Sequence, residues 1–163
     1  MDHEQHIADA FANIHKHEWQ DARAALSSSK HEEEIVYLLM RIVRFVYDMC
    51  TEDAWVHRHT NKHSPPQDDL EEFLEKRLPR TLHKDQVTKP VRSFIKACIK
   101  RVHEMTATKQ PLTIYWLPKG DPIEHEKFEL EGKATGHLCD WTVWPAVVKS
   151  DGTLLRKGVI IPI

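Results

Sequence analysis

Histidine is the residue type whose spacing in this chain first suggests chemistry. The chain has 12 histidines, and the densest group is His57, His59 and His63. Neutral imidazole nitrogens bind zinc and copper. However, no cysteine or carboxylate stands at a recognised ligand spacing beside these three, and the polar residues 51–67 end in two prolines. We therefore interpret residues 51–67 as a solvated loop, with a short helix around Trp55, and expect no metal and no other cofactor.

Arg58 and His63 form a second pattern in the same stretch. Residues 58–63 resemble the Arg-(Asn/Asp/His)-x3-His motif of the HEPN ribonucleases. The resemblance implies an all-helical fold and a metal-independent site, in which the histidine transfers protons and the arginine balances phosphate charge. A similar spacing recurs at Arg77 and His83. A ribonuclease that uses Arg58 and His63 is the alternative to our leading interpretation, which has no catalytic residue.

The cysteines do not indicate nucleophilic catalysis. Cys98 falls on the apolar face of an expected helix, and Cys50 and Cys139 have no neighbouring motif. Three separated cysteines are typical of reduced thiols in the cytosol. Phosphate-binding glycine loops and nucleophile elbows are absent from the sequence. We therefore predict a cytoplasmic protein that is not an enzyme.

Charge is divided unevenly along the chain. Residues 1–75 carry 16 acidic and 7 basic side chains, a net charge of −9, whereas residues 76–109 carry 10 basic and 2 acidic side chains, a net charge of +8. Such a division indicates either a basic surface for an anionic partner or two segments that neutralise each other within the fold.

The basic residues of the second segment include a helical stripe. We take this stripe as the candidate lipid- and anion-binding site, made of Lys89, Arg92, Lys96, Lys100 and Arg101. Basic residues near an anionic membrane contribute about 1 kcal/mol each. No aromatic residue interleaves with them, which weighs against nucleic acid. The expected partner is therefore an anionic lipid or a protein.

Apolar residues repeat at helical spacing through the first two-thirds of the chain. They predict a helix over about 3–25, a central core helix over about 30–50 capped at Ser29, a short helix between Asp68 and Pro79, and a helix over about 89–106. No apolar run approaches the ~20 residues of a membrane span. The acidic start also lacks the features of a targeting segment.

The last third predicts strands. Residues 112–117 read as a strand and 123–138 as irregular, and two apolar runs around Gly152 read as a β-hairpin. Pro145 removes a ladder donor, so the chain there forms an edge strand, a bulge or an irregular crossing. The fold class is α+β, with a small antiparallel β element after the helices. We expect one domain over 1–163: an N-terminal helix (1–28), a helical core (30–110) and a β-rich end (111–163).

The end of the chain also resembles a known family. Val143-Trp-Pro-Ala146, the turn at Gly152 and Leu154-Leu-x-Lys-Gly-Val159 are similar to the C-terminal signature of the mitochondria-eating protein family. The resemblance extends over about residues 30–160, and the last 20 are its specific part. It implies a structural role for the signature residues, which are Trp144, Pro145, Gly152, Leu155, Lys157 and Gly158.

The resemblance also implies a function. Members of that family are non-enzymatic, act in mitochondrial quality control, bind cardiolipin and self-assemble. We therefore expect an interaction module that is peripheral at the mitochondrial outer membrane and binds a protein or a cardiolipin-like lipid, with self-association. This chain lacks the heptad-rich coiled coil that precedes the domain in that family. We expect Trp141 or Trp144 to fasten the β-rich end to the helices.

Overall fold

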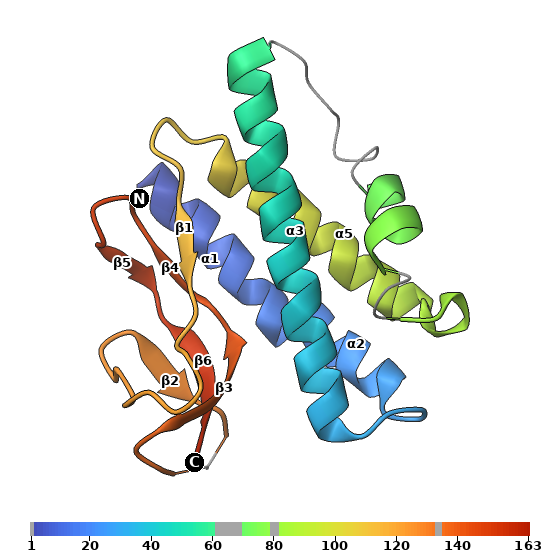
Figure 1. Ribbon diagram of the computed structural model, residues 1–163. Coiled ribbons are helices and arrows are strands. Elements are labelled where there is room, and N and C mark those ends of the chain that lie inside the picture. The colour runs from blue at the N-terminus through green and yellow to red at the C-terminus, as the bar shows by residue number, and fades with distance from the viewer. Residues whose placement is uncertain (1, 61–69, 79–81, 133–134) are drawn as a thin grey trace.

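The computed structural model describes residues 2–60, 70–78, 82–132 and 135–163. Figure 1 shows long helices on one side of the molecule and the strands against them on the other. The helical elements are α1 (His3–Lys16), α2 (Glu18–Leu26), α3 (Glu32–Thr60), the short π-helix η1 (Phe73–Arg77), the 3-10 turn η3 (Lys84–Gln86) and α5 (Lys89–Thr106).

Short strands follow the helices. They are β1 (Thr113–Tyr115), β2 (Phe128–Leu130), β3 (Cys139–Trp144), β4 (Ala146–Val148), β5 (Leu154–Arg156) and β6 (Gly158–Pro162). Within the described residues they form two three-stranded sheets, in the orders β1-β4-β5 and β2-β6-β3. Neighbouring strands are antiparallel except β2 and β6, which are parallel. The predicted α+β fold class is confirmed.

Helix α5 follows its sequence pattern closely. Thr88 precedes it in an extended conformation and Pro90 lies in its first turn, where a missing N–H costs no hydrogen bond. Its apolar stripe is buried, and Cys98 within that stripe is fully buried. Burial raises the pKa of the Cys98 thiol well above its usual value, so this cysteine is an inert core residue as predicted.

The first helical segment departs from its prediction. A single helix over 3–25 was expected, but the backbone of His17, at φ −122° and ψ −83°, breaks it into α1 and α2. On a straight helix Trp19 would lie about 80° around the axis from Phe11. The break lets both rings enter the core, where Phe11 is 0% and Trp19 2% exposed.

The central helix is longer than predicted. Its buried face is the one expected, but α3 continues to Thr60, so residues 51–60 are helical and not a loop. Contacts four residues apart support this extension: His59 stacks on Trp55 at 4.2 Å, and the Thr60 hydroxyl donates to the Val56 carbonyl at 2.6 Å. Residues 61–67 lie outside the described residues.

Two further predictions need correction. Ser29 does not cap α3, since that helix starts at Glu32 and the Ser29 hydroxyl donates to the Leu26 carbonyl at the end of α2. Residues 123–138 are not wholly irregular, because they contain β2. A single buried residue, Phe128, anchors β2 between charged neighbours, so no alternating pattern marks it. Asp68 and Pro79, which bound the predicted short helix, lie outside the described residues.

The predicted hairpin is the loop between β4 and β5. The Lys149 N–H donates to the Thr153 carbonyl at 2.8 Å, and Gly152 has the positive φ of 89° that favours glycine. Both arms then continue into the second sheet, the first at Pro145 and the second at Lys157. Pro145 is therefore a crossing point between sheets.

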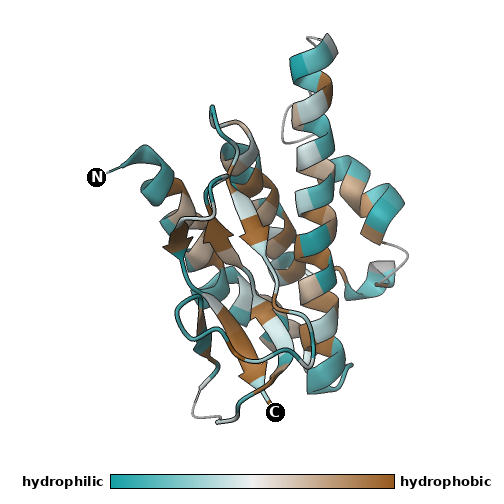
Figure 2. Cartoon of the chain, turned by 60° about the vertical axis from the view of Figure 1, so that its left-hand side comes forward, coloured by the Kyte–Doolittle hydropathy of each residue, from teal (hydrophilic) through white to brown (hydrophobic). Residues whose placement is uncertain are grey.

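The two arms touch at Gly158. A Cβ atom there would lie 2.5 Å from the Trp144 carbonyl oxygen and 2.6 Å from the Ala146 nitrogen. Trp144, which is 1% exposed, points from this crossing into the helices and lies 4.8 Å from the Phe11 ring and 6.4 Å from the Phe94 ring, centroid to centroid. Figure 2 shows apolar residues on the strands and on the helices behind them. One core therefore joins strands and helices.

We predict that Gly158→Ala lowers the free energy of unfolding by about 3 kcal/mol, because backbone atoms surround the added methyl group. Gly152→Ala is the control: nothing lies within 4 Å of its Cβ position, so only the positive φ costs energy, about 1 kcal/mol. Urea unfolding of both variants measures the difference. Equal losses would contradict a tight crossing at Gly158.

Candidate functional site

The candidate site is the outer face of α5. Lys89, Lys96 and Lys100 recur at helical spacing opposite the buried stripe, and all three are exposed. The packing of α5 against α1, α2 and α3 fixes the direction of this face. The lysines therefore present a cationic line to solvent along about three turns of helix.

Ion pairs occupy only part of the basic stripe. Arg92 pairs with Glu71 at 3.2 Å, and Arg101 pairs with Glu104 on its own helix at 2.8 Å. The three lysines form no ion pair with any of the residues that the structure describes. Neutralisation between the two segments, the alternative left open by the charge pattern, therefore reaches Arg92 but, among the described residues, none of the three lysines. Arg101 is paired within its own segment.

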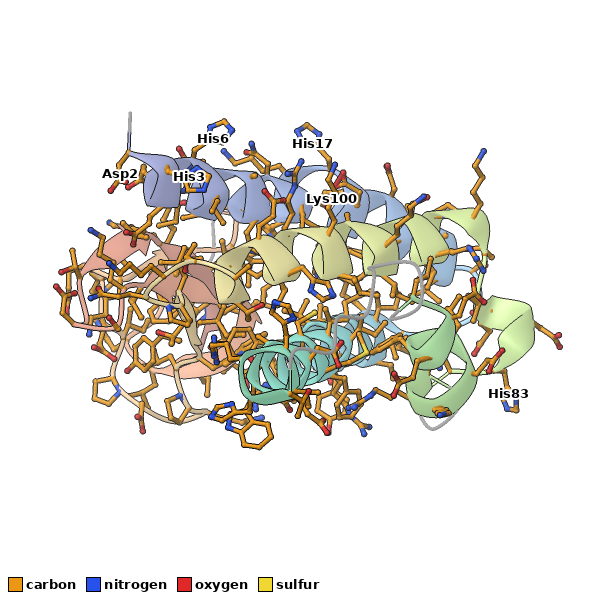
Figure 3. All side chains as sticks on the ribbon, turned by 90° about the horizontal axis from the view of Figure 1, so that it is seen from above. Asp2, His3, His6, His17, His83 and Lys100 are labelled. Atoms are coloured by element: carbon orange, nitrogen blue, oxygen red, sulfur yellow. The ribbon has the colours of Figure 1, made fainter. Side chains whose placement is uncertain are left out.

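A groove between α1 and α5 extends this surface. Its volume is about 440 Å³. Lys96, Lys100 and Arg101 line it from α5, and His17 and Glu18 line it from the break between α1 and α2. Figure 3 shows His3, His6 and His17 along the outer side of α1, on the same side of the molecule as Lys100. We call this combined surface, with Lys89, the α1–α5 face.

Acidic residues are few on the α1–α5 face. Glu18 lies in the groove just described, and Glu18 and Asp21 border a second groove beside Lys89. Among the described residues of 1–75, acidic side chains therefore form no ion pair with the lysines, although α1 and α2 pack against α5. Within the described part of the chain, no helix combines the length and apolar character that crossing a bilayer requires.

The histidine and arginine patterns near residue 60 do not belong to the α1–α5 face. His57, Arg58 and His59 are exposed on the last turns of α3, and His63 lies outside the described residues, so the Arg58–His63 pairing has no geometry to report. Among described residues, no cluster of three or more His, Cys, Asp or Glu side chains could hold a metal ion. The α+β fold also differs from the all-helical fold that the ribonuclease motif implies.

Three of the six family-signature residues lie where the chain crosses between the two sheets. Trp144, Pro145 and Gly158 are buried there, whereas Leu155 is half-buried and Gly152 lies in the exposed hairpin turn. The exposed Lys157 donates from Nζ to the His125 carbonyl at 3.1 Å. None of these residues lies on the α1–α5 face.

A half-buried histidine beside Trp144, His15, was not identified from the sequence. His15 packs against Trp19 at 4.9 Å and Trp144 at 5.9 Å, and it lines a cavity of about 660 Å³ between α1 and the strands. Among the described residues, its Nε2 atom has no hydrogen-bond partner, and it lies 3.7 Å from Glu131 Oε2. Burial, with a smaller contribution from Lys16, lowers the pKa of His15 to about 4. No residue spacing signals this contact, because Glu131 lies far along the chain.

Comparison with known proteins agrees with the sequence signature. The family model described as mitochondria-eating protein matches residues 76–162. This chain belongs to the mitochondria-eating protein family. No curated protein and no solved structure matches it. The matched segment contains all of α5 and every described strand, so the lysines of the α1–α5 face lie within the family domain. The family name connects the chain with mitochondria.

We predict that acid weakens the fold through His15. A lowered pKa in the folded state means that the unfolded chain takes up the proton first. The stability contributed by neutral His15 is therefore fully present above about pH 6.5 and is lost as the pH falls towards 4, by about 3 kcal/mol. Burial raises the pKa of Glu131, which acts in the opposite direction.

His15→Phe isolates the effect, because it keeps a ring between the tryptophans and leaves Glu131 in place. Urea unfolding of both proteins between pH 4 and 7 is the measurement. We expect the wild type to lose more stability than the variant on acidification. Parallel pH profiles would show that His15 does not titrate in this way.

Proposed function

We propose that this family member is a non-catalytic module that binds anionic phospholipid at the mitochondrial outer membrane. The observation that carries the proposal is the line of Lys89, Lys96 and Lys100, exposed and without ion pairs among the described residues. Lysine ammonium groups are compact point charges, which suit lipid phosphates that move within a bilayer surface. Cardiolipin, with two phosphates, is the headgroup we propose.

The neighbouring groups favour a flat anionic surface over a small ligand. The groove between α1 and α5 is open to solvent, and Lys96 and Lys100, which line it, are themselves exposed. The paired Arg92 and Arg101 keep part of their surface exposed, so they add to the local positive potential. Binding is therefore electrostatic and peripheral, with no penetration of the hydrocarbon layer.

We further propose that residues 1–163 act as one domain, although the family match begins at residue 76. The support is the continuous core: Phe11 of α1 and Trp144 of β3 are in contact, and Gln5 of α1 donates from its amide nitrogen to the Leu155 carbonyl at 2.8 Å. His17, which borders the proposed site, also comes from this first segment.

The prediction is that Lys96→Glu with Lys100→Glu weakens binding to vesicles containing cardiolipin by about 30-fold or more. Each lysine contributes about 1 kcal/mol, and a tenfold change in affinity corresponds to about 1.4 kcal/mol. Flotation with increasing vesicle concentration measures the affinity. Binding should also weaken as the salt concentration is raised, because the lysines and the lipid phosphates are both exposed to solvent and are screened by ions.

The matched control is Lys127→Glu with Lys149→Glu, which changes the net charge equally but lies at the β-rich end, where the two lysines pair with Glu124 and Asp2. We expect this variant to bind like the wild type. An equal loss of vesicle binding in both variants would show that binding depends on net charge and not on this face. No binding of wild type to the vesicles, at low salt, would reject the lipid partner and leave a protein partner for this face.

A further inference from the structure

A second cationic surface lies on the outer side of α3. Arg41 stands one helical turn from Tyr37 and from Phe45, and its guanidinium carbon lies 5.5 Å from the Tyr37 ring centroid and 5.2 Å from the Phe45 centroid. The guanidinium carbon of Arg44 lies 4.6 Å from the centroid of Trp116, just after β1. Each guanidinium therefore rests on an aromatic ring.

The strands complete this surface. Trp141 of β3 makes an edge contact with Tyr37, with ring centroids 5.5 Å apart. Tyr37 is 43% exposed, whereas the rings of Phe45, Trp116 and Trp141 are partly buried and pack against the core. We call this set of two arginines and four aromatic residues the arginine–aromatic surface. It combines segments separated by about a hundred residues, so the sequence alone does not reveal it.

Within the described part of the chain, Arg41 and Arg44 have no carboxylate partner. Among the residues that the structure describes, Arg41 and Arg44 take part in cation–π contacts and in no ion pair. A guanidinium group above an aromatic ring keeps its N–H donors in its own plane, where they can bind a carboxylate with two parallel hydrogen bonds. Stacking also fixes the side chain before binding, so less conformational entropy is lost when a partner arrives.

We propose that the arginine–aromatic surface docks an acidic peptide segment of a partner protein, with carboxylates on Arg41 and Arg44 and an apolar side chain on Tyr37. Arginine, tyrosine and tryptophan are the residues that dominate binding energy in protein interfaces. The positive charges of Arg41 and Arg44 complement acidic side chains, and the exposed ring of Tyr37 complements an apolar side chain.

Other anionic macromolecules fit this surface less well. Base stacking on single-stranded nucleic acid needs free ring faces, but the arginines cover the faces of Phe45 and Trp116, and Lys119 lies 4.7 Å over the face of Trp141. Insertion into a membrane interface needs exposed apolar anchors, and Tyr37 is the exposed aromatic residue among those in this set.

The arginine–aromatic surface and the α1–α5 face lie on opposite sides of the molecule. In Figure 3, α3 is seen nearly end-on on one side of the molecule, whereas α1 with His3, His6 and His17 lies along the other side. A membrane and a peptide could therefore be bound at the same time. The inference does not depend on the lipid proposal, since it uses a different set of residues.

The test begins with a displayed library of random peptides selected on the full chain, and the enriched peptides are the probes. We expect them to combine at least two acidic residues with an apolar one. Arg41→Gln with Arg44→Gln should weaken their binding about tenfold or more, whereas Lys96→Gln with Lys100→Gln should leave it unchanged. Circular dichroism confirms that each variant is folded.

Nuclear magnetic resonance of the tryptophan indole N–H groups locates the binding. The probes should shift the signals of Trp116 and Trp141 and leave that of the buried Trp19 in place. The proposal is overturned if no peptide is enriched, if the enriched peptides lack acids, or if the lysine variant loses binding instead. It is also overturned if cardiolipin vesicles or single-stranded DNA shift the same two signals more readily than the peptides do.

Discussion

The close crossing of two chain segments at Gly158 is the contact on which the rest of the structure depends. Gly158 has no Cβ atom, so its backbone can lie close to the Trp144 carbonyl. This close approach lets both arms of the hairpin pass from one sheet to the other, at Pro145 and at Lys157. That exchange turns Trp144 towards the helices, where Phe11 and Phe94 receive it. The strands are thereby fixed to α1 and α5, and the direction of α5 decides where its lysines point.

The two proposed binding surfaces use cations in different ways. On the α1–α5 face, lysines stand free in solvent, which suits mobile phosphates in a bilayer. On the arginine–aromatic surface, guanidinium groups are held against rings, which suits carboxylates in a defined geometry. The fold separates these surfaces, since α5 belongs to one and α3 to the other. A module with these two proposed surfaces would connect a membrane with a second protein.

The sequence predicted those elements whose own residues show a local pattern, such as an apolar stripe, a helix-start residue or a turn glycine. The apolar stripe, Thr88 and Pro90 define α5 within the chain itself, and the lysine stripe follows from the same periodicity. Gly152 marks the hairpin turn because only a residue that tolerates positive φ fits there. The family signature was visible for a related reason: Pro145 and Gly158 meet local backbone requirements at the crossing, and Gly152 meets one at the hairpin turn.

Features that depend on distant residues could not be predicted. His17 breaks the first helix because Trp19 has a place in a core built from later segments. Phe128 pairs in parallel with β6, and nothing in its polar surroundings indicates that partner. The stacking of Arg44 on Trp116, and the contact between His15 and Glu131, likewise join segments far apart in sequence.

The most direct test of the central claim is to find which face of the chain meets a membrane. The cysteines Cys50, Cys98 and Cys139 are buried, so an environment-sensitive fluorophore can be placed selectively on Ser93→Cys of α5 or on Asp48→Cys of α3, both exposed positions. On vesicles containing cardiolipin, we expect a blue shift in emission at position 93 and none at position 48. A shift at position 48 alone, or equal shifts at both, would contradict this expectation.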